Sequence, residues 1–343
     1  MRCFTRRWRT ALGLVLALAV MEIVVRLYYT VSVRFEPGVG YVNAPGTVRW
    51  SREGHGETRW TDHGVRADTP PDLTQPSVLV LGDSFTEALQ VDQDESFSAG
   101  LAHALRRYGI SVINAGRSTV STADYVALAP HYQQLFHPRW VVFALNEHDL
   151  TDDSFQALPG RTHFRLRDDG DLDLISPDTV ARQGLSMGIW AIRQKVMLVG
   201  YGFVRAGDFR EATLREPALF RAGNAVPPPA TLADDYPVEA ELGALRRAWS
   251  DRLTILYLSD FDPLHPDRSS SSVEPRLFAY CATNHLSCVS LRSQFADLVR
   301  RGLAPYGFAN SNYNQGHMNR NGHSVAARAL VVELTGPIQS AIL

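Results

Sequence analysis

The stretch Val78-Leu-Val-Leu-Gly-Asp-Ser-Phe-Thr-Glu87 joins an apolar run directly to a polar turn. Such an unbroken apolar run predicts a strand that is buried on both faces, as in a parallel sheet. Gly82, Asp83 and Ser84 predict a sharp turn at the carboxyl end of that strand. Open α/β folds place their chemistry at this edge of the sheet. Ser84 is therefore a candidate functional residue, and the alternative is that Gly-Asp-Ser only caps the following helix.

Strand-like and helix-like segments alternate along the rest of the chain. Phe97, Leu101 and Leu105, for example, recur at the four-residue spacing of one helix face. The predicted strands are 77–82, 110–115, 138–145, 253–258 and 287–291, and the predicted helices are 95–108, 123–135, 238–250, 274–285 and 322–334. This alternation favours parallel crossovers, so the sequence predicts an α/β fold with a mainly parallel sheet.

The decapeptide Gly82–Val91 resembles the first sequence block of the SGNH (GDSL-type) hydrolases. Members of that family fold as a flavodoxin-like three-layer α/β/α sandwich, and their four blocks carry Ser, Gly, Asn and His. The resemblance covers roughly residues 77–150 and the part of the chain from about residue 253. It implies a nucleophilic Ser84 and a hydrolase domain over residues 77–343, with an insertion at about 151–237. It implies neither a metal nor an organic cofactor.

A serine hydroxyl needs a base to act as a nucleophile at neutral pH, and His317 is the candidate. It lies in Asn314-Gln-Gly-His-Met-Asn319, just before the last predicted helix, where the resembling family places its basic histidine. The alternative is that His317 only caps that helix. His323 is a reserve candidate, although it falls inside the predicted helix.

The residues before His317 depart from the family pattern. The family places an aspartate two or three residues before its histidine, where this chain has Gln315 and Asn314. The amide oxygen of Asn314 can orient the imidazole, but it cannot stabilise the imidazolium as a carboxylate does. The substitution predicts a weaker base unless another acid or a backbone carbonyl orients the ring.

The two oxyanion blocks are also substituted. In Asn114-Ala-Gly-Arg-Ser-Thr119, the family's oxyanion glycine aligns with Thr119, whose backbone N–H is the only group required. In the third block, Asn146-Glu-His-Asp149, an ungapped alignment places His148 at the asparagine position. We favour His148 as the side-chain donor there. Asn146, acting through a shifted loop, is the alternative.

The N-terminus has the pattern of a membrane anchor. Arg2, Arg6, Arg7 and Arg9 precede an apolar stretch over residues 11–33, which predicts a cytoplasmic tip and an extracytoplasmic domain. We expect an uncleaved anchor over residues 1–33, although residues 17–19 also fit a signal-peptidase site. Residues 34–76 have no clean periodicity and are interpreted as a linker whose short strands pack on the domain edge.

The formal net charge of −2 gives no basic field for nucleic acid. Cys281 and Cys288 are close enough in sequence to pair in an oxidising compartment, and two buried thiols are the alternative. His55 and His63 show no metal-ligand spacing. Within the 151–237 insertion, residues 164–166 and 172–175 predict a hairpin, and residues 184–204 could form an amphipathic helix that touches the membrane or shapes the pocket.

Two functions follow from these patterns. The first is a membrane-anchored serine esterase or O-acyl (acetyl) transferase that acts on acylated polysaccharides or other esters outside the cytoplasmic membrane. The second is a catalytically weakened SGNH-like module that binds polysaccharide or a membrane acyltransferase partner. The second function rests on the substituted blocks and on Glu22 and Arg26, which share one face of the anchor helix, and we prefer the first.

Overall fold

The computed structural model describes residues 2–28, 33–36, 40–51, 53–118, 120–157, 161–176, 236–259, 265, 269, 271–311 and 315–342. The chain divides into two compact units, residues 1–32 with 183–230 and residues 33–182 with 231–343. Each unit is described by itself.

The described part of the first unit is helix α1 (Arg2–Tyr28). Its window Trp8–Val25 has a mean hydropathy of 1.9, and the apolar side chains along it are exposed. The helix is therefore long and apolar enough to cross a membrane, a property that signal sequences share. The predicted pairing of Glu22 with Arg26 lies outside the described residues, because the Arg26 side chain is not among them.

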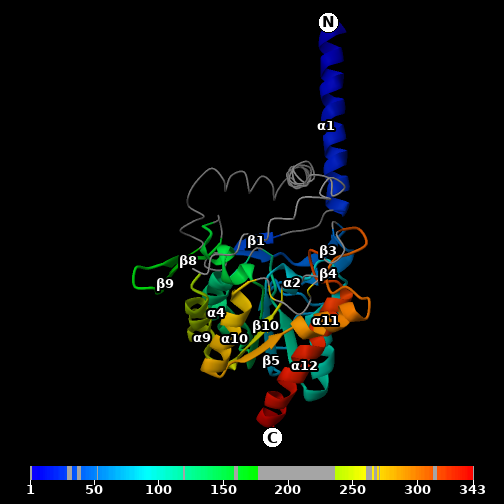
Figure 1. Ribbon diagram of the computed structural model, residues 1–343. Coiled ribbons are helices and arrows are strands. Elements are labelled where there is room, and N and C mark those ends of the chain that lie inside the picture. Colours follow the sequence, from blue (N-terminus) through cyan, green and yellow to red (C-terminus); the bar gives the residue numbers. More distant parts are fainter. Residues whose placement is uncertain are drawn as a thin grey trace, which may run out of the picture. The chain divides into compact units, whose positions relative to one another are not determined.

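The second unit is built on a five-stranded parallel sheet (Figure 1). From one edge to the other the strands are β6 (Ser111–Asn114), β5 (Ser77–Gly82), β7 (Trp140–Leu145), β10 (Leu253–Tyr257) and β11 (Ser287–Ser290). This is the 2-1-3-4-5 order of flavodoxin-like folds. The topology of the sheet therefore confirms the predicted fold class.

Helices cover both faces of the sheet, which explains the continuous apolar run in β5. Leu79 and Leu81 point into one core, and Val78 and Val80 point into the other. The first core is closed by α4 (Thr122–Phe136), α9 (Val238–Trp249) and α10 (Val273–Asn284), and the second by α3 (Phe97–Leu105), α11 (Arg292–Arg300) and α12 (Arg320–Ile342). Every residue of β5 is buried, which accounts for the unbroken apolar run Val78–Leu81 within it.

Shorter elements complete the second unit. Residues 33–76 contain two antiparallel hairpins, one of β1 (Val33–Glu36) and β2 (Gly40–Asn43), the other of β3 (Gly46–Trp50) and β4 (Gly56–Trp60). The predicted hairpin in the insertion is present as β8 (His163–Leu166) and β9 (Leu172–Ile175). Short helical turns are α2 (Ser84–Glu87), α5 (Asp152–Phe155), Gln93–Glu95, Arg106–Tyr108, His148–Leu150 and Ser250–Arg252. The amphipathic helix expected at 184–204 lies outside the described residues.

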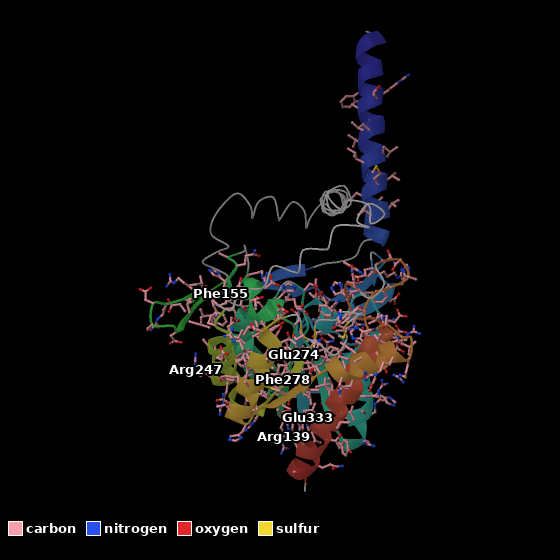
Figure 2. All side chains as sticks on the ribbon, viewed as in Figure 1. Arg139, Phe155, Arg247, Glu274, Phe278 and Glu333 are labelled. Atoms are coloured by element: carbon pink, nitrogen blue, oxygen red, sulfur yellow. A yellow bond between two sulfur atoms is a disulfide. The ribbon has the colours of Figure 1, made fainter. Side chains whose placement is uncertain are left out.

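Two helices differ from the sequence-based expectation. Helix α11 was not predicted, although Leu291, Phe295 and Leu298 are all buried at helical spacing. Helix α12 extends eight residues beyond the predicted end at 334, through Gly336 and Pro337. Glu274 and Phe278 on α10 and Glu333 on α12 are labelled in Figure 2, which shows the side chains on the ribbon.

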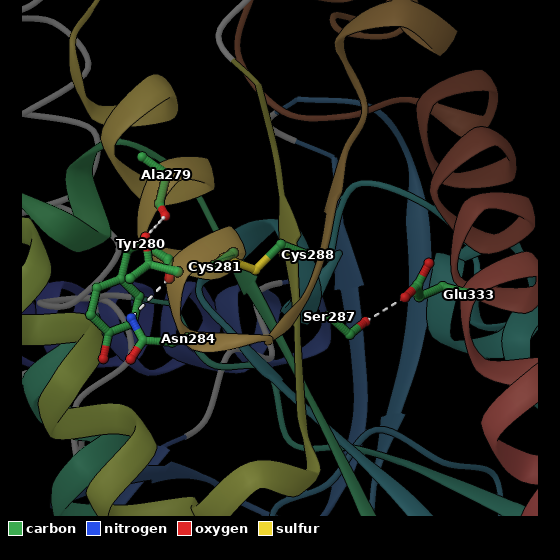
Figure 3. Close-up of a disulfide and its surroundings, with 8 residues drawn as sticks. Ala279, Tyr280, Cys281, Asn284, Ser287, Cys288 and Glu333 are labelled. Carbon is green, nitrogen blue, oxygen red and sulfur yellow. Dashed lines mark hydrogen bonds between the residues drawn. A yellow bond between two sulfur atoms is a disulfide. The ribbon is translucent and has the colours of Figure 1, made fainter.

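Cys281 at the end of α10 and Cys288 on β11 form a disulfide, with their Cα atoms 6.3 Å apart (Figure 3). Of the two alternatives left open by the sequence, the paired state is therefore the one in the structure. Beside it, the Ser287 hydroxyl donates to Glu333 on α12 at 2.6 Å, which ties the same edge strand to the helix layer.

Reduction of this disulfide is expected to lower the free energy of unfolding by about 2–3 kcal/mol, because closure of a short loop restricts the unfolded chain. Urea denaturation of a protein that begins near Arg34, with and without dithiothreitol, measures the change in the free energy of unfolding. The double variant Cys281→Ser/Cys288→Ser should not respond to the reductant. Superimposable wild-type curves would contradict the prediction.

Candidate active site

The turn after β5 presents Ser84 at the carboxyl edge of the sheet. Gly82 ends the strand where a Cβ atom would meet Thr86 Oγ1 at 2.0 Å and the Ala144 carbonyl oxygen at 2.9 Å. Asp83 then caps α2, and its Oδ1 accepts the backbone N–H of Phe85 at 2.9 Å. The glycine lets the chain turn against β7, and the cap fixes the direction in which Ser84 leaves the sheet.

The structure brings together the two residues that the sequence nominated as nucleophile and base. Nε2 of His317 lies 2.9 Å from Oγ of Ser84, although the residues are 233 positions apart. The His317 side chain is 27 % exposed, so it can be reached from solvent. The ring of Phe85 packs on the imidazole with 5.0 Å between ring centroids, and Tyr306 meets the edge of Phe85.

Glu53 supplies the carboxylate that the residues preceding His317 lack. Its Oε2 lies 2.6 Å from Nδ1 of His317, and its Oε1 accepts the backbone N–H of His317 at 2.9 Å. A carboxylate at Nδ1 holds the proton on that nitrogen, which leaves Nε2 free to accept the Ser84 proton. The sequence predicts a weaker base unless another acid orients the ring, and Glu53 is placed as such an acid.

The turn that carries Glu53 joins β3 to β4 and is held by Asn310. Gly54 donates its N–H to Asn310 Oδ1 at 2.8 Å, and Asn310 Nδ2 donates to the Gly54 and Ser51 carbonyls at 3.0 and 3.2 Å. Gly54 has a φ of +68°, and a Cβ atom there would lie 2.4 Å from the Gln90 carbonyl oxygen. The acid thus comes from the segment interpreted as a linker, and a C-terminal loop fixes its position.

Sequence reasoning missed Glu53 and named Asn314 instead. Asn314 lies outside the described residues, and so does Thr119. The signal that could have found Glu53 is a lone glutamate in the turn Glu53-Gly-His-Gly56, which the sequence does not distinguish from an ordinary surface turn. Among the described residues, no group of three or more His, Cys, Asp or Glu side chains is placed to hold a metal ion.

Asn146 lies beside the turn that carries Ser84, and hydrogen bonds fix the orientation of its side-chain amide. Its Oδ1 accepts the backbone N–H groups of His148 and Asp149 at 2.8 and 3.3 Å, and its Nδ2 donates to Asp83 Oδ2 at 2.7 Å. An amide nitrogen carries two hydrogens, so one remains for another acceptor. The side chain of His148, by contrast, is exposed.

Two carboxyl groups, the half-buried Asp83 and the buried Asp149, lie behind this arrangement. Burial raises the pKa of Asp83 to about 6, against the hydrogen bond from the Phe85 N–H and the charge of His317, which lower it. Burial, followed by the nearby Asp83, raises the pKa of Asp149 well above its ordinary value. Asp149 accepts the Asn146 N–H at 2.9 Å and the Tyr125 hydroxyl at 3.4 Å, so it supports the loop that carries Asn146.

His323, the reserve base, is a core residue in the structure. It is 1 % exposed, its Nδ1 accepts the Phe97 N–H at 3.3 Å, and its ring stacks on the ring of Phe97. Burial lowers its pKa to about 3, with the charges of Arg66 and His317 acting in the same direction. The ring is held neutral inside the second core and is not placed at Ser84.

His323→Gln is expected to change the pH dependence of stability, because the variant lacks the buried imidazole. Between the folded pKa of about 3 and the unfolded value of 6.5, only the unfolded state binds the proton, so acidification destabilises the wild type. The variant lacks this effect. The difference in unfolding free energy between wild type and variant should therefore shrink by about 1.4 kcal/mol per pH unit from about pH 6 to pH 4. Urea curves across this range measure it, and parallel pH profiles would contradict it.

No family model and no curated protein matches the sequence. Solved structures match at low identity. A two-domain esterase active on acetylated mannans is 11 % identical with a TM-score of 0.41; the match covers 77 % of this chain and half of that longer chain. The acetylxylan esterase Axe2 of Geobacillus stearothermophilus, as a catalytic mutant, is 16 % identical over 76 % of this chain and 94 % of that chain, with a TM-score of 0.40. The lipase/acylhydrolase of Enterococcus faecalis is 12 % identical over 76 % and 96 %, with a TM-score of 0.41.

Proposed function

We propose that the protein is a serine-dependent ester hydrolase whose reacting groups are Ser84, His317 and Glu53. The observation that carries the proposal is the continuous hydrogen-bonded chain from Ser84 Oγ through both ring nitrogens of His317 to Glu53 Oε2. Nucleophile, base and orienting acid within hydrogen-bond reach are the geometric signature of nucleophilic acyl transfer. A purely binding module has no need of this arrangement.

The geometry performs the reaction in two stages. Ser84 Oγ attacks the ester carbonyl carbon while Nε2 of His317 takes its proton, and Glu53 stabilises the imidazolium that forms. The bond from the carbonyl carbon to the alkoxy oxygen then breaks, and His317 returns the proton to the departing alcohol. In the second stage water, or a sugar hydroxyl in the transferase version of the proposal, attacks the acyl carbon while His317 takes its proton. The bond from that carbon to Ser84 Oγ then breaks, and His317 returns the proton to Ser84.

The oxyanion is assigned to the backbone N–H of Ser84, the backbone N–H of Thr119 and the side-chain amide of Asn146. Asn146 is preferred to His148 for two reasons. Its Nδ2 donates one hydrogen to Asp83, in the turn that carries Ser84, and the second hydrogen is left for another acceptor. Loss of one such donor typically costs about 10²–10³ in rate. We therefore assign the side-chain oxyanion contact to the remaining amide hydrogen of Asn146 and not to the exposed ring of His148.

The proposed location is the outer side of the cytoplasmic membrane, with α1 as the anchor. Arginines at positions 2, 6, 7 and 9 precede the apolar window, which favours a cytoplasmic N-terminus. The Cys281–Cys288 disulfide supports the same side, because disulfides persist in oxidising compartments. An acylated glycan is the substrate class proposed from this location and from the resemblance to SGNH hydrolases, and a membrane acyltransferase remains a proposed partner.

Hydrolysis of p-nitrophenyl acetate by a soluble protein beginning near Arg34 tests the proposal. Acetate release from an acetylated xylan, measured in parallel, tests the substrate class. Turnover that depends on Ser84 and His317 supports the esterase, and acetate release from the glycan supports the narrower assignment. Absence of Ser84-dependent turnover on both substrates would overturn the esterase proposal and favour the binding module.

A further inference from the structure

A buried carboxylate, Glu87, lies one helical turn beyond Ser84 and bonds to Asn43 and Ser118. It is 4 % exposed and takes no part in the chain from Ser84 to Glu53. Its Oε2 accepts both the backbone N–H of Ser118, at 3.1 Å, and the Ser118 hydroxyl. Its Oε1 accepts Asn43 Nδ2 at 3.0 Å. A buried carboxylate is costly unless it is hydrogen-bonded in this way.

The loop that Glu87 contacts is the one that carries the proposed oxyanion N–H. Ser118 immediately precedes Thr119, and Arg117 N–H donates to the Gly82 carbonyl at 3.0 Å. Gly116 packs on the α2 backbone so closely that a Cβ atom would lie 2.5 Å from the Glu87 nitrogen. The backbone of residues 116 and 117 therefore contacts the turn that carries Ser84, and the Glu87 side chain holds the following residue, Ser118.

Arg66 holds the other side of the same helical turn. It is 4 % exposed, its Nη1 donates to the Glu87 carbonyl at 2.7 Å, and its Nη2 donates to the Asp92 carbonyl at 2.7 Å. Burial lowers the pKa of Arg66 to about 10, while the charge of Glu87 opposes that change, so the guanidinium stays charged at neutral pH. Backbone and side chain of Glu87 are thus both fixed.

We propose that Glu87 is a positioning residue that holds residues 116–118, the start of the proposed oxyanion loop, against the turn that carries Ser84. The inference rests on the proposed function, since it assigns the loop its role in acyl transfer. A carboxylate is suited to the task because one of its oxygens takes two donors from Ser118 while the other takes Asn43. A glutamine offers a single acceptor oxygen and cannot satisfy both sides. Loss of the Glu87 carboxylate should therefore weaken stabilisation of the transition state, which lowers kcat, and leave substrate binding nearly unchanged.

Glu87→Gln and Ser118→Ala test the inference, with Glu239→Gln as the matched control. Glu239 lies on α9, where its carboxylate pairs with Arg276 at the surface. We expect Glu87→Gln and Ser118→Ala to lower kcat for p-nitrophenyl acetate by about 10-fold to 100-fold, less than the loss of a whole oxyanion donor, with KM within twofold. Glu239→Gln should change kcat less than threefold, and Ser118→Thr, which keeps the hydroxyl, should retain most of the activity.

Inhibition by phenylboronic acid separates positioning from a merely structural role. The boronate forms a tetrahedral adduct on the serine oxygen and so resembles the oxyanion intermediate. Its Ki should rise in each variant by the factor by which kcat/KM falls. Equal kcat for Glu87→Gln, Ser118→Ala and Glu239→Gln, or a boronate Ki unchanged from wild type, would overturn the inference while leaving the esterase intact. A wild type without Ser84-dependent turnover would overturn the proposed function and this inference with it.

Discussion

Ser84→Ala is expected to lower kcat for p-nitrophenyl acetate by at least about 10⁴-fold, because it removes the atom that forms the acyl-enzyme. The hydroxyl is the only group of the proposed triad that bonds to substrate carbon. Its removal leaves the hydrogen bond between His317 and Glu53 in place, so the fold should be retained. Circular dichroism and urea denaturation establish that the variant is folded.

The outcome of Ser84→Ala also decides between the two functions. His317→Ala should produce a loss of similar size, because Ser84 is not deprotonated without its base. A folded Ser84→Ala variant that retains more than a tenth of wild-type activity would contradict the proposed nucleophile. Activity that survives in both variants would assign the turnover to another site.

Glu53→Gln is expected to lower kcat by about 10³–10⁴-fold with little change in KM, because an amide neither stabilises the imidazolium nor secures the required tautomer. Glu53 accepts two N–H groups of His317, one from the ring and one from the backbone. Glutamine has one acceptor oxygen, so one of these contacts becomes a donor facing a donor. Steady-state kinetics over a range of pH measure the loss.

Glu57→Gln is the matched control for Glu53→Gln. Glu57 lies on β4 in the same hairpin, its side chain is 42 % exposed, and it pairs with Arg49 at 3.0 Å at the surface. Exposed ion pairs contribute little, about 0–1 kcal/mol, so this control should keep its activity within twofold. Equal activity of the two variants would show that Glu53 is not the orienting acid.

The sequence was sufficient for the sheet and for two members of the proposed triad, Ser84 and His317. Strand β5 is apolar on both faces because both faces are covered, and that pattern is visible in the four consecutive residues Val78–Leu81. Ser84 and His317 each lie in a local motif next to a helix start. Ser84 follows the carboxyl end of β5, whereas His317 lies in the loop between α11 and α12, so their pairing across 233 positions was expected from the family resemblance and not from the strand order.

Glu53 could not be found in the same way. It stands 264 positions from His317 in a segment without periodicity, and its turn depends on a contact with Asn310 that no local pattern records. His323 illustrates the opposite case. Its sequence environment matched the family motif, but only its burial against Phe97 shows that it is a core residue. Helix α12 was predicted too short because Gly336 and Pro337 suggest a helix end in sequence.

Covalent labelling of Ser84 tests the central claim most directly. The soluble domain is treated with a fluorophosphonate and its intact mass is measured, followed by peptide mapping. The triad predicts one phosphonyl group per chain on the peptide containing Ser84, slower labelling in Glu53→Gln, and none in Ser84→Ala. A wild type that remains unmodified, or that is modified equally in Ser84→Ala, would contradict the account.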